Sequence, residues 1–162
     1  MDNYRGYLSN DPNAVNAMLL ASNLAGKAIN ITTTTAPHAL SYKLTSTRGI
    51  PHGHAVALCM APCWEYLIRM AQDGERVDEA NATVLGKRLG EISTCICASE
   101  DASLDAGLEC FSKLTQGLGM GERLLLSQNE INILVSSVNL QRLGNFPIEL
   151  SRNTIERIYN TV

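Results

Sequence analysis

Apolar residues recur along the chain mainly with the spacing of α-helices, and segments with the alternating pattern of β-strands are scarce. Asp11-Pro12 is a favourable helix start, because aspartate caps free backbone N–H groups and proline suits the first helical position. The β-branched, hydroxylated run 32–35 disfavours continuation of this helix. The apolar stripe predicted for it consists of Val15, Met18, Leu19, Ala25 and Ile29, widened by Leu20 and Leu24.

The rest of the chain shows the same helical spacing. A second helix is predicted to restart at 35–37 and to run through Leu44, and the segment Gly49-Ile50-Pro51 breaks it. A long apolar helix then follows over about 52–70, with a kink expected at Pro62. Further helices are predicted near 77–98, 103–116, 128–142 and 152–160.

Helix starts and turns are marked locally in the second half. Ser127 and Glu130 have the spacing of a capping box, and Ser151 is positioned to cap the last helix. Residues 145–147 are expected to form the connecting turn. The glycine-rich segment 117–121 follows no strand, so it is not a dinucleotide fingerprint. The sequence predicts an all-α fold, a single helical-bundle domain of about six to eight helices over residues 1–162.

Composition and charge exclude several classes of protein. Hydrophobic residues make up 45% of the chain, enough for a packed core, and the net charge is only −3. The 13 basic residues are scattered among 16 acidic ones, so no basic face for nucleic acid is expected. No apolar run reaches the roughly 18 residues of a membrane span, and residues 1–5 lack the pattern of a signal peptide. We expect a cytoplasmic protein that binds neither nucleic acid nor membrane.

The five cysteines cannot all pair in disulfides, because their number is odd. Cys59 and Cys63 lie one helical turn apart in an apolar stretch, where cysteine behaves as a small hydrophobic residue. Cys95 and Cys97 lack the spacing of a zinc-binding pair. The predicted state of all five, Cys110 included, is therefore a buried free thiol.

All three histidines fall between His38 and His54. His38 and His52 each directly follow a proline, which places each near the first turn of a helix. Two helix starts joined by a short connection can bring both imidazoles towards one point, and neutral imidazole binds divalent iron, zinc or nickel well. Two histidines are too few for a complete metal site, so the spacing alone leaves structural or surface histidines as the alternative.

Several segments together resemble the iron-containing alcohol dehydrogenases. They are 25–29 (AGKAI), 38–42 (HALSY), 49–57 (GIPHGHAVA) and 138–147 (VNLQRLGNFP). The paired-histidine segment is the most specific of them. Residues 33–42 are in addition similar to members described as phosphonoacetaldehyde reductases, which suggests that branch of the family.

The resemblance implies that His38 and His52 are ligands of one catalytic metal, commonly iron, with zinc as an alternative. It further implies hydride transfer between NAD or NADP and an alcohol–aldehyde pair. The family's other two ligands come from a D-x-x-x-H segment, but no histidine precedes His38. No glycine-rich nucleotide-binding half is visible either, so no residue is assigned to the nucleotide. We therefore expect the metal-binding C-terminal part of such an enzyme, inactive alone, with the N-terminal domain absent.

The same resemblance bears on Tyr42 and Arg142, and His54 is kept beside them as a possible site residue. Tyr42 occupies the position of a family histidine one turn after His38, and it is the candidate catalytic residue. It could relay a proton, and the alternative is a role in packing or in substrate contact. Its phenol, with an ordinary pKa near 10, is poorly matched to base chemistry at neutral pH. Arg142 could pair with an anionic group on the substrate, although an ordinary surface arginine is the alternative. His54 lies about 200° around a helix from His52, so it is expected to point elsewhere, and it is kept as a second candidate substrate contact.

A different class of function stays open from the sequence. The chain could be a non-catalytic helical oligomerisation or interaction module that has kept the family scaffold. Surface uncovered by the missing domain would then drive association, and metal would have no effect. A zinc-dependent enzyme acting on glycerol or a sugar phosphate is a third possibility. Under each reading we expect a homo-oligomer.

Overall fold

The computed structural model describes residues 3–72 and 78–162, and these ranges contain nine α-helices and no β-strand. The all-α prediction is confirmed. None of the helices in these ranges has the length and apolar character that crossing a membrane requires. Contacts divide the chain into two compact units that adjoin in sequence at Thr34 and Thr35.

The first unit consists of α1 (Tyr4–Leu8), which the sequence did not predict, and α2 (Pro12–Ile31). The predicted cap of α2 is confirmed, because the Asp11 carboxylate accepts hydrogen bonds from the N–H groups of Asn13 and Ala14 at 2.8 and 3.1 Å. Ala14 is the buried residue of α2. Four residues of the predicted apolar stripe are exposed to solvent and not buried: Leu19, Leu20, Leu24 and Ile29.

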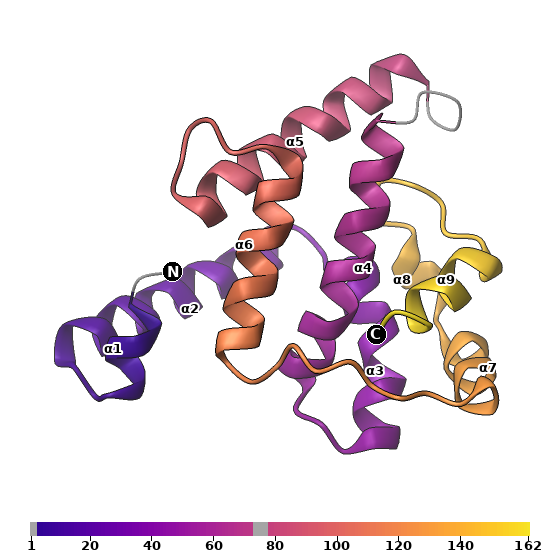
Figure 1. The fold of residues 1–162 in the computed structure, drawn as a ribbon, viewed down its shortest axis with the longest axis horizontal. Coiled ribbons are helices and arrows are strands. Elements are labelled where there is room, and N and C mark those ends of the chain that lie inside the picture. The colour runs from indigo at the N-terminus through magenta and orange to yellow at the C-terminus, as the bar shows by residue number, and fades with distance from the viewer. Residues whose placement is uncertain (1–2, 73–77) are drawn as a thin grey trace. The chain divides into compact units, whose positions relative to one another are not determined.

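The second unit is organised around α4 (His52–Gln72), with α3 (Ala36–Arg48) packed against it. Figure 1 shows α6 (Leu104–Gly117) on one side of α4, with α5 (Glu79–Cys97) running across the upper end of α4 in this view. The short helices α7 (Gln128–Ser137), α8 (Leu140–Leu143) and α9 (Arg152–Tyr159) lie on the other side.

Two apolar clusters lie along α4 and hold these helices together. The first half of α4, with Leu58, Cys59 and Cys63, packs into a core that also contains residues of α3, α7, α8 and α9. The second half, with Trp64 and Ile68, packs into a cluster with residues of α5 and α6. Burial of each large side chain in such clusters contributes about 1.5–3 kcal/mol. The long helix is therefore the element that joins the two halves of the unit.

Two helix boundaries differ from the prediction. Helix α3 runs past Leu44 to Arg48 and ends at Gly49, whose φ of +67° is a left-handed conformation that glycine adopts without strain. Its last turn tolerates polar β-branched residues because Thr47 donates its hydroxyl hydrogen to the Lys43 carbonyl at 2.8 Å. The single helix expected over 128–142 is two helices, because Asn139 caps a new start at the N–H of Gln141.

Other predicted caps are confirmed. The Ser127 side chain accepts from the N–H of Glu130, and the Glu130 carboxylate accepts from the N–H of Ser127 at 2.9 Å, which completes the capping box. The Ser151 hydroxyl accepts from the N–H of Thr154 at 3.1 Å and begins α9. These caps depend only on neighbouring residues, which is why the sequence reveals them.

The cysteine prediction was wrong for three residues. Cys97 and Cys110 form a disulfide between α5 and α6, and Cys95 is an exposed free thiol. Cys59 and Cys63 are buried free thiols as predicted, and burial raises the pKa of the Cys59 thiol to about 12. Counting cysteines could not reveal the disulfide, because it depends on how closely the two helices approach.

Candidate metal centre

His38 and His52 come together although they belong to different helices. His38 lies in the first turn of α3 and is half-buried, whereas His52 is the first residue of α4 and is exposed. Their ring centroids are 5.5 Å apart and their planes meet at 68°. The two proline-led helix starts therefore converge, which a short connection between them allows.

This geometry fits a shared metal ion. An ion about 2.1 Å from one nitrogen of each ring would lie about 3.2 Å from each centroid, so two such centroids can be at most about 6.4 Å apart. The observed 5.5 Å is within that limit. Partial burial, and then the charge of His52, lower the pKa of His38. A lower pKa favours neutral imidazole, which is the form that binds metals.

The pair provides only part of a coordination sphere. Within residues 3–72 and 78–162, no group of three or more His, Cys, Asp or Glu side chains is arranged to hold a metal ion. A catalytic zinc or iron site has three or more protein ligands. The two histidines could therefore occupy two of the coordination positions around a metal ion.

Tyr42 and Arg142 extend the histidine pair into a row of stacked groups. The Tyr42 ring is stacked on His52, with centroids 5.2 Å apart and an interplanar angle of 16°. The Arg142 guanidinium of α8 lies over the Tyr42 ring, 4.6 Å from its centroid. Both Tyr42 and Arg142 are exposed, and the described part of the chain gives Arg142 no ion-pair partner. A cation thus lies next to the histidine pair with its charge uncompensated.

Ser41 belongs to this neighbourhood and was not predicted from the sequence. Its side chain is fully buried. Its hydroxyl donates to the His38 backbone carbonyl at 2.9 Å and lies 3.4 Å from Nδ1 of His52. Its position one turn after His38 is the available sequence signal, but the contact with His52 depends on how α3 packs against α4.

His54 is separate from this row. It is half-buried, and its Nε2 atom is enclosed without a hydrogen-bond partner among the described residues. The ring contacts of the described residues join His52 to His38 and Tyr42, and none of them includes His54. Its suggested contact with substrate stays a prediction.

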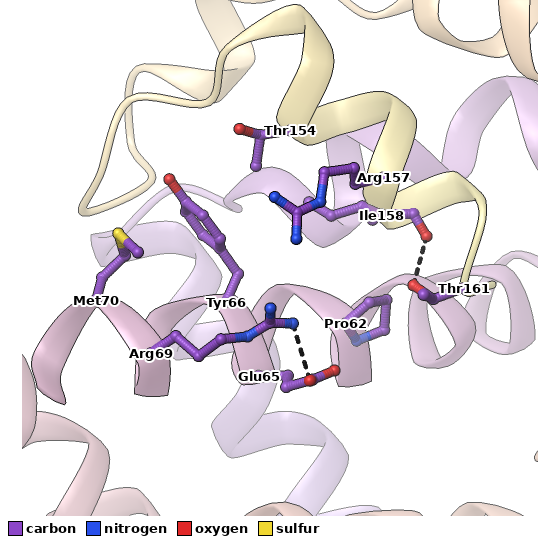
Figure 2. Close-up of a pocket in the computed structure, with 9 residues that line it drawn as sticks. All are labelled: Pro62, Glu65, Tyr66, Arg69, Met70, Thr154, Arg157, Ile158 and Thr161. Carbon is purple, nitrogen blue, oxygen red and sulfur yellow. Dashed lines mark hydrogen bonds and ion pairs between the residues drawn. The ribbon is translucent and has the colours of Figure 1, made fainter. Parts of the chain in front are cut away.

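A pocket of about 290 Å³ lies between α4 and α9 (Figure 2) and contains none of the predicted site residues. Figure 2 shows the Arg69 and Arg157 side chains reaching into it, with Arg69 paired to Glu65 at 2.8 Å. Pro62, where this lining begins on α4, is about 15 Å along the helix axis from His52. The pocket is therefore distinct from the histidine pair.

The match to a known family covers almost the whole chain. A sequence model described as the Fe-containing alcohol dehydrogenase family, C-terminal, matches residues 2–162. Comparison with curated proteins and with solved structures found no match. The matched range contains both convergent histidines together with Ser41, Tyr42 and Arg142. The chain therefore belongs to the iron-containing alcohol dehydrogenase family and corresponds to its C-terminal domain.

Proposed function

We propose that His38 and His52 are two of the ligands of the catalytic metal, iron or another divalent ion such as zinc, in an NAD(P)-dependent alcohol dehydrogenase. The observation that supports this most directly is the 5.5 Å separation of the two imidazoles within a chain of this family. The remaining ligands and the nucleotide site come from a nucleotide-binding domain outside the residues that we describe. Residues 1–162 alone then bind metal weakly and do not turn over substrate.

The chemistry we propose is the interconversion of an alcohol and an aldehyde. When bound, a divalent metal would supply Lewis acidity and a nicotinamide cofactor would supply the hydride chemistry. His38 and His52 would hold the metal from two helix starts. Tyr42, stacked against His52, presents its phenol beside them and either relays a proton or orients the substrate.

We further propose that the substrate carries an anionic group such as a phosphonate, phosphate or carboxylate, as in the phosphonoacetaldehyde-reductase branch. The support is the exposed Arg142 guanidinium beside Tyr42, because guanidinium pairs strongly with such groups. In the enzyme that includes the nucleotide-binding domain, Arg142→Ala should raise KM for an anionic aldehyde by about tenfold or more. KM for a neutral aldehyde of similar size should change little. Equal changes for both substrates would refute the anionic assignment.

Arg152→Ala is the matched control for this measurement. Arg152 is also exposed, but it lies at the start of α9 and contacts the Ser136 hydroxyl at 3.3 Å instead of the Tyr42 ring. Its removal takes away the same charge and should leave the KM of both aldehydes unchanged. If Arg152→Ala also raised KM for the anionic aldehyde alone, the effect of Arg142→Ala would reflect a general electrostatic influence on substrate binding and not a direct contact.

Metal binding to residues 1–162 tests the ligand assignment. We would titrate the metal-free chain with Zn²⁺ or Fe²⁺ and follow binding by calorimetry. His38→Ala or His52→Ala should lower the affinity by at least the 10- to 100-fold that is typical of lost supporting contacts around a metal site. The matched control is His54→Ala, which removes an imidazole two residues from His52 and should leave the affinity unchanged.

Two results would overturn the assignment. One is a wild-type chain that binds no metal, and the other is a loss of affinity as large in His54→Ala as in His52→Ala. Activity gives a separate check: residues 1–162 with metal, an aldehyde and NADH or NADPH should show no oxidation of the nucleotide. Robust turnover would contradict the proposed inactivity and require a nucleotide site within this chain.

A non-catalytic oligomerisation module is the second candidate, favoured by one observation. Helix α2 exposes the large apolar side chains Leu19, Leu20, Leu24 and Ile29 within the first unit, and exposed apolar patches commonly mark interaction sites. We would measure the mass of the chain in solution with metal and with a chelator. Association that is the same with metal and with a chelator, together with no metal binding, would favour this candidate over the C-terminal domain of a dehydrogenase. In either case we propose a cytoplasmic homo-oligomer.

A further inference from the structure

Ser41 connects the two histidines through one buried hydroxyl group. Its side chain has no exposed surface, and it lies between the backbone of His38 and the ring of His52. The Oγ atom is 2.9 Å from the His38 carbonyl oxygen and 3.4 Å from His52 Nδ1. A hydroxyl in this position is in contact with both helix starts.

The chemistry of the two partners determines which group donates. A carbonyl oxygen only accepts, so the shorter contact takes the single hydroxyl hydrogen of Ser41. Only the lone pairs of Oγ are then left for His52. The contact at Nδ1 is favourable only if that nitrogen carries the hydrogen and donates it. A neutral His52 with a hydrogen on Nδ1 has a free lone pair on Nε2.

We propose that Ser41 is a positioning residue that holds neutral His52 in the Nδ1–H form and leaves Nε2 as the metal-binding nitrogen. The ring nitrogen that carries the hydrogen is set by the hydrogen bond it makes, and partners of this kind orient metal-binding histidines. The same hydroxyl restrains α3 at the His38 carbonyl. The consequence for metal affinity rests on the proposed function, but the choice of tautomer does not.

The opposite arrangement makes a different prediction. If Ser41 donated to His52 Nδ1, its hydroxyl would leave the His38 carbonyl, and His52 would carry its hydrogen on Nε2. That nitrogen would then have to lose a proton before binding a metal. The shorter of the two contacts, at the carbonyl, argues against this arrangement.

Nuclear magnetic resonance of the metal-free chain distinguishes the two tautomers. With ¹⁵N-labelled histidine at mildly alkaline pH, long-range ¹H–¹⁵N spectra show which ring nitrogen is protonated, and His52→Gln assigns the signals. We expect Nδ1–H as the majority form of His52 in the wild type. In Ser41→Ala it should become the minority form, because free neutral imidazole side chains prefer the Nε2–H form.

Ser46→Ala is the matched control. Ser46 is also in α3, and its hydroxyl likewise donates to a carbonyl one turn earlier, that of Lys43, at 3.0 Å. It is exposed and has no histidine partner among the described residues, so its loss should leave the tautomer of His52 unchanged. A Nε2–H majority in the wild type overturns the proposal without any substitution. An unchanged tautomer in Ser41→Ala overturns it as well.

Metal titration separates this inference from the proposed function. We expect Ser41→Ala to weaken Zn²⁺ binding by about 10- to 100-fold, and Ser46→Ala to leave it unchanged. If the wild type binds no Zn²⁺ while the tautomer shifts as predicted, the proposed function fails and the positioning role stands. If the wild type and Ser41→Ala bind Zn²⁺ equally, the positioning role for the metal fails and the ligand assignment stands.

Discussion

Helices α5 and α6 are in tight contact at Gly107, where a single substitution should destabilise this half of the unit. Gly107 of α6 lies directly against Ser93 of α5, whose side chain is fully buried. A Cβ atom at position 107 would be 2.8 Å from the Cα atom of Ser93 and closer still to its Oγ atom. Ordinary contacts between carbon atoms are about 3.5–4.0 Å long. Because one of the close atoms belongs to the backbone, a rotamer change cannot relieve the clash.

Gly107→Ala should therefore destabilise the protein. Overpacking costs about 1–3 kcal/mol, and the contact with the backbone places this site in the upper part of that range. Alanine is about 1 kcal/mol better than glycine inside a helix, which offsets part of the loss. The free energy of unfolding should thus fall by about 1–2 kcal/mol, measured by urea denaturation of the chemically reduced protein with circular dichroism.

Gly90→Ala is the control on the same helix pair. A Cβ atom at position 90 would meet Leu104 Cδ2 at 3.9 Å, an ordinary contact, so this variant should gain about 0.5–1 kcal/mol. The disulfide gives a second readout, because Cys97 and Cys110 lie one turn beyond Ser93 and Gly107, with Cα atoms 5.8 Å apart. Gly107→Ala should leave more free thiols after oxidation. Equal stability of the two alanine variants would refute the close approach.

Three further predictions concern the buried groups of the second unit. Tyr159→Phe should cost about 0.5–1.5 kcal/mol in urea denaturation, because the buried hydroxyl donates to the Leu40 carbonyl at 2.8 Å; an unchanged midpoint would contradict this hydrogen bond. A thiol reagent should label Cys95 in the native protein and leave Cys59 and Cys63 unlabelled until unfolding, as followed by mass spectrometry. Above pH 9 the unfolded thiol ionises while folded Cys59 stays protonated until about pH 12, so the free energy of unfolding should fall as pH rises through this window. That slope should be smaller in Cys59→Ala.

The sequence by itself determined the local features of the protein. Helical periodicity indicated the all-α class, and Asp11, Ser127 and Ser151 mark helix starts because each cap bonds a backbone N–H two or three residues away. The same local logic placed His38 and His52 behind prolines at two helix starts. It failed at Asn139, where a cap interrupts a continuous apolar pattern.

Only the tertiary structure decided which of these residues meet. The 5.5 Å between the imidazoles, the Ser41 hydroxyl beside His52 and the Arg142 guanidinium over Tyr42 each join separate helices, so they depend on helix packing. The disulfide has the same origin, because the spacing of cysteines along the chain does not reveal how closely α5 approaches α6. Short-range hydrogen bonding can be read from neighbouring residues, whereas contacts between helices depend on how the buried side chains of the whole unit fill its core.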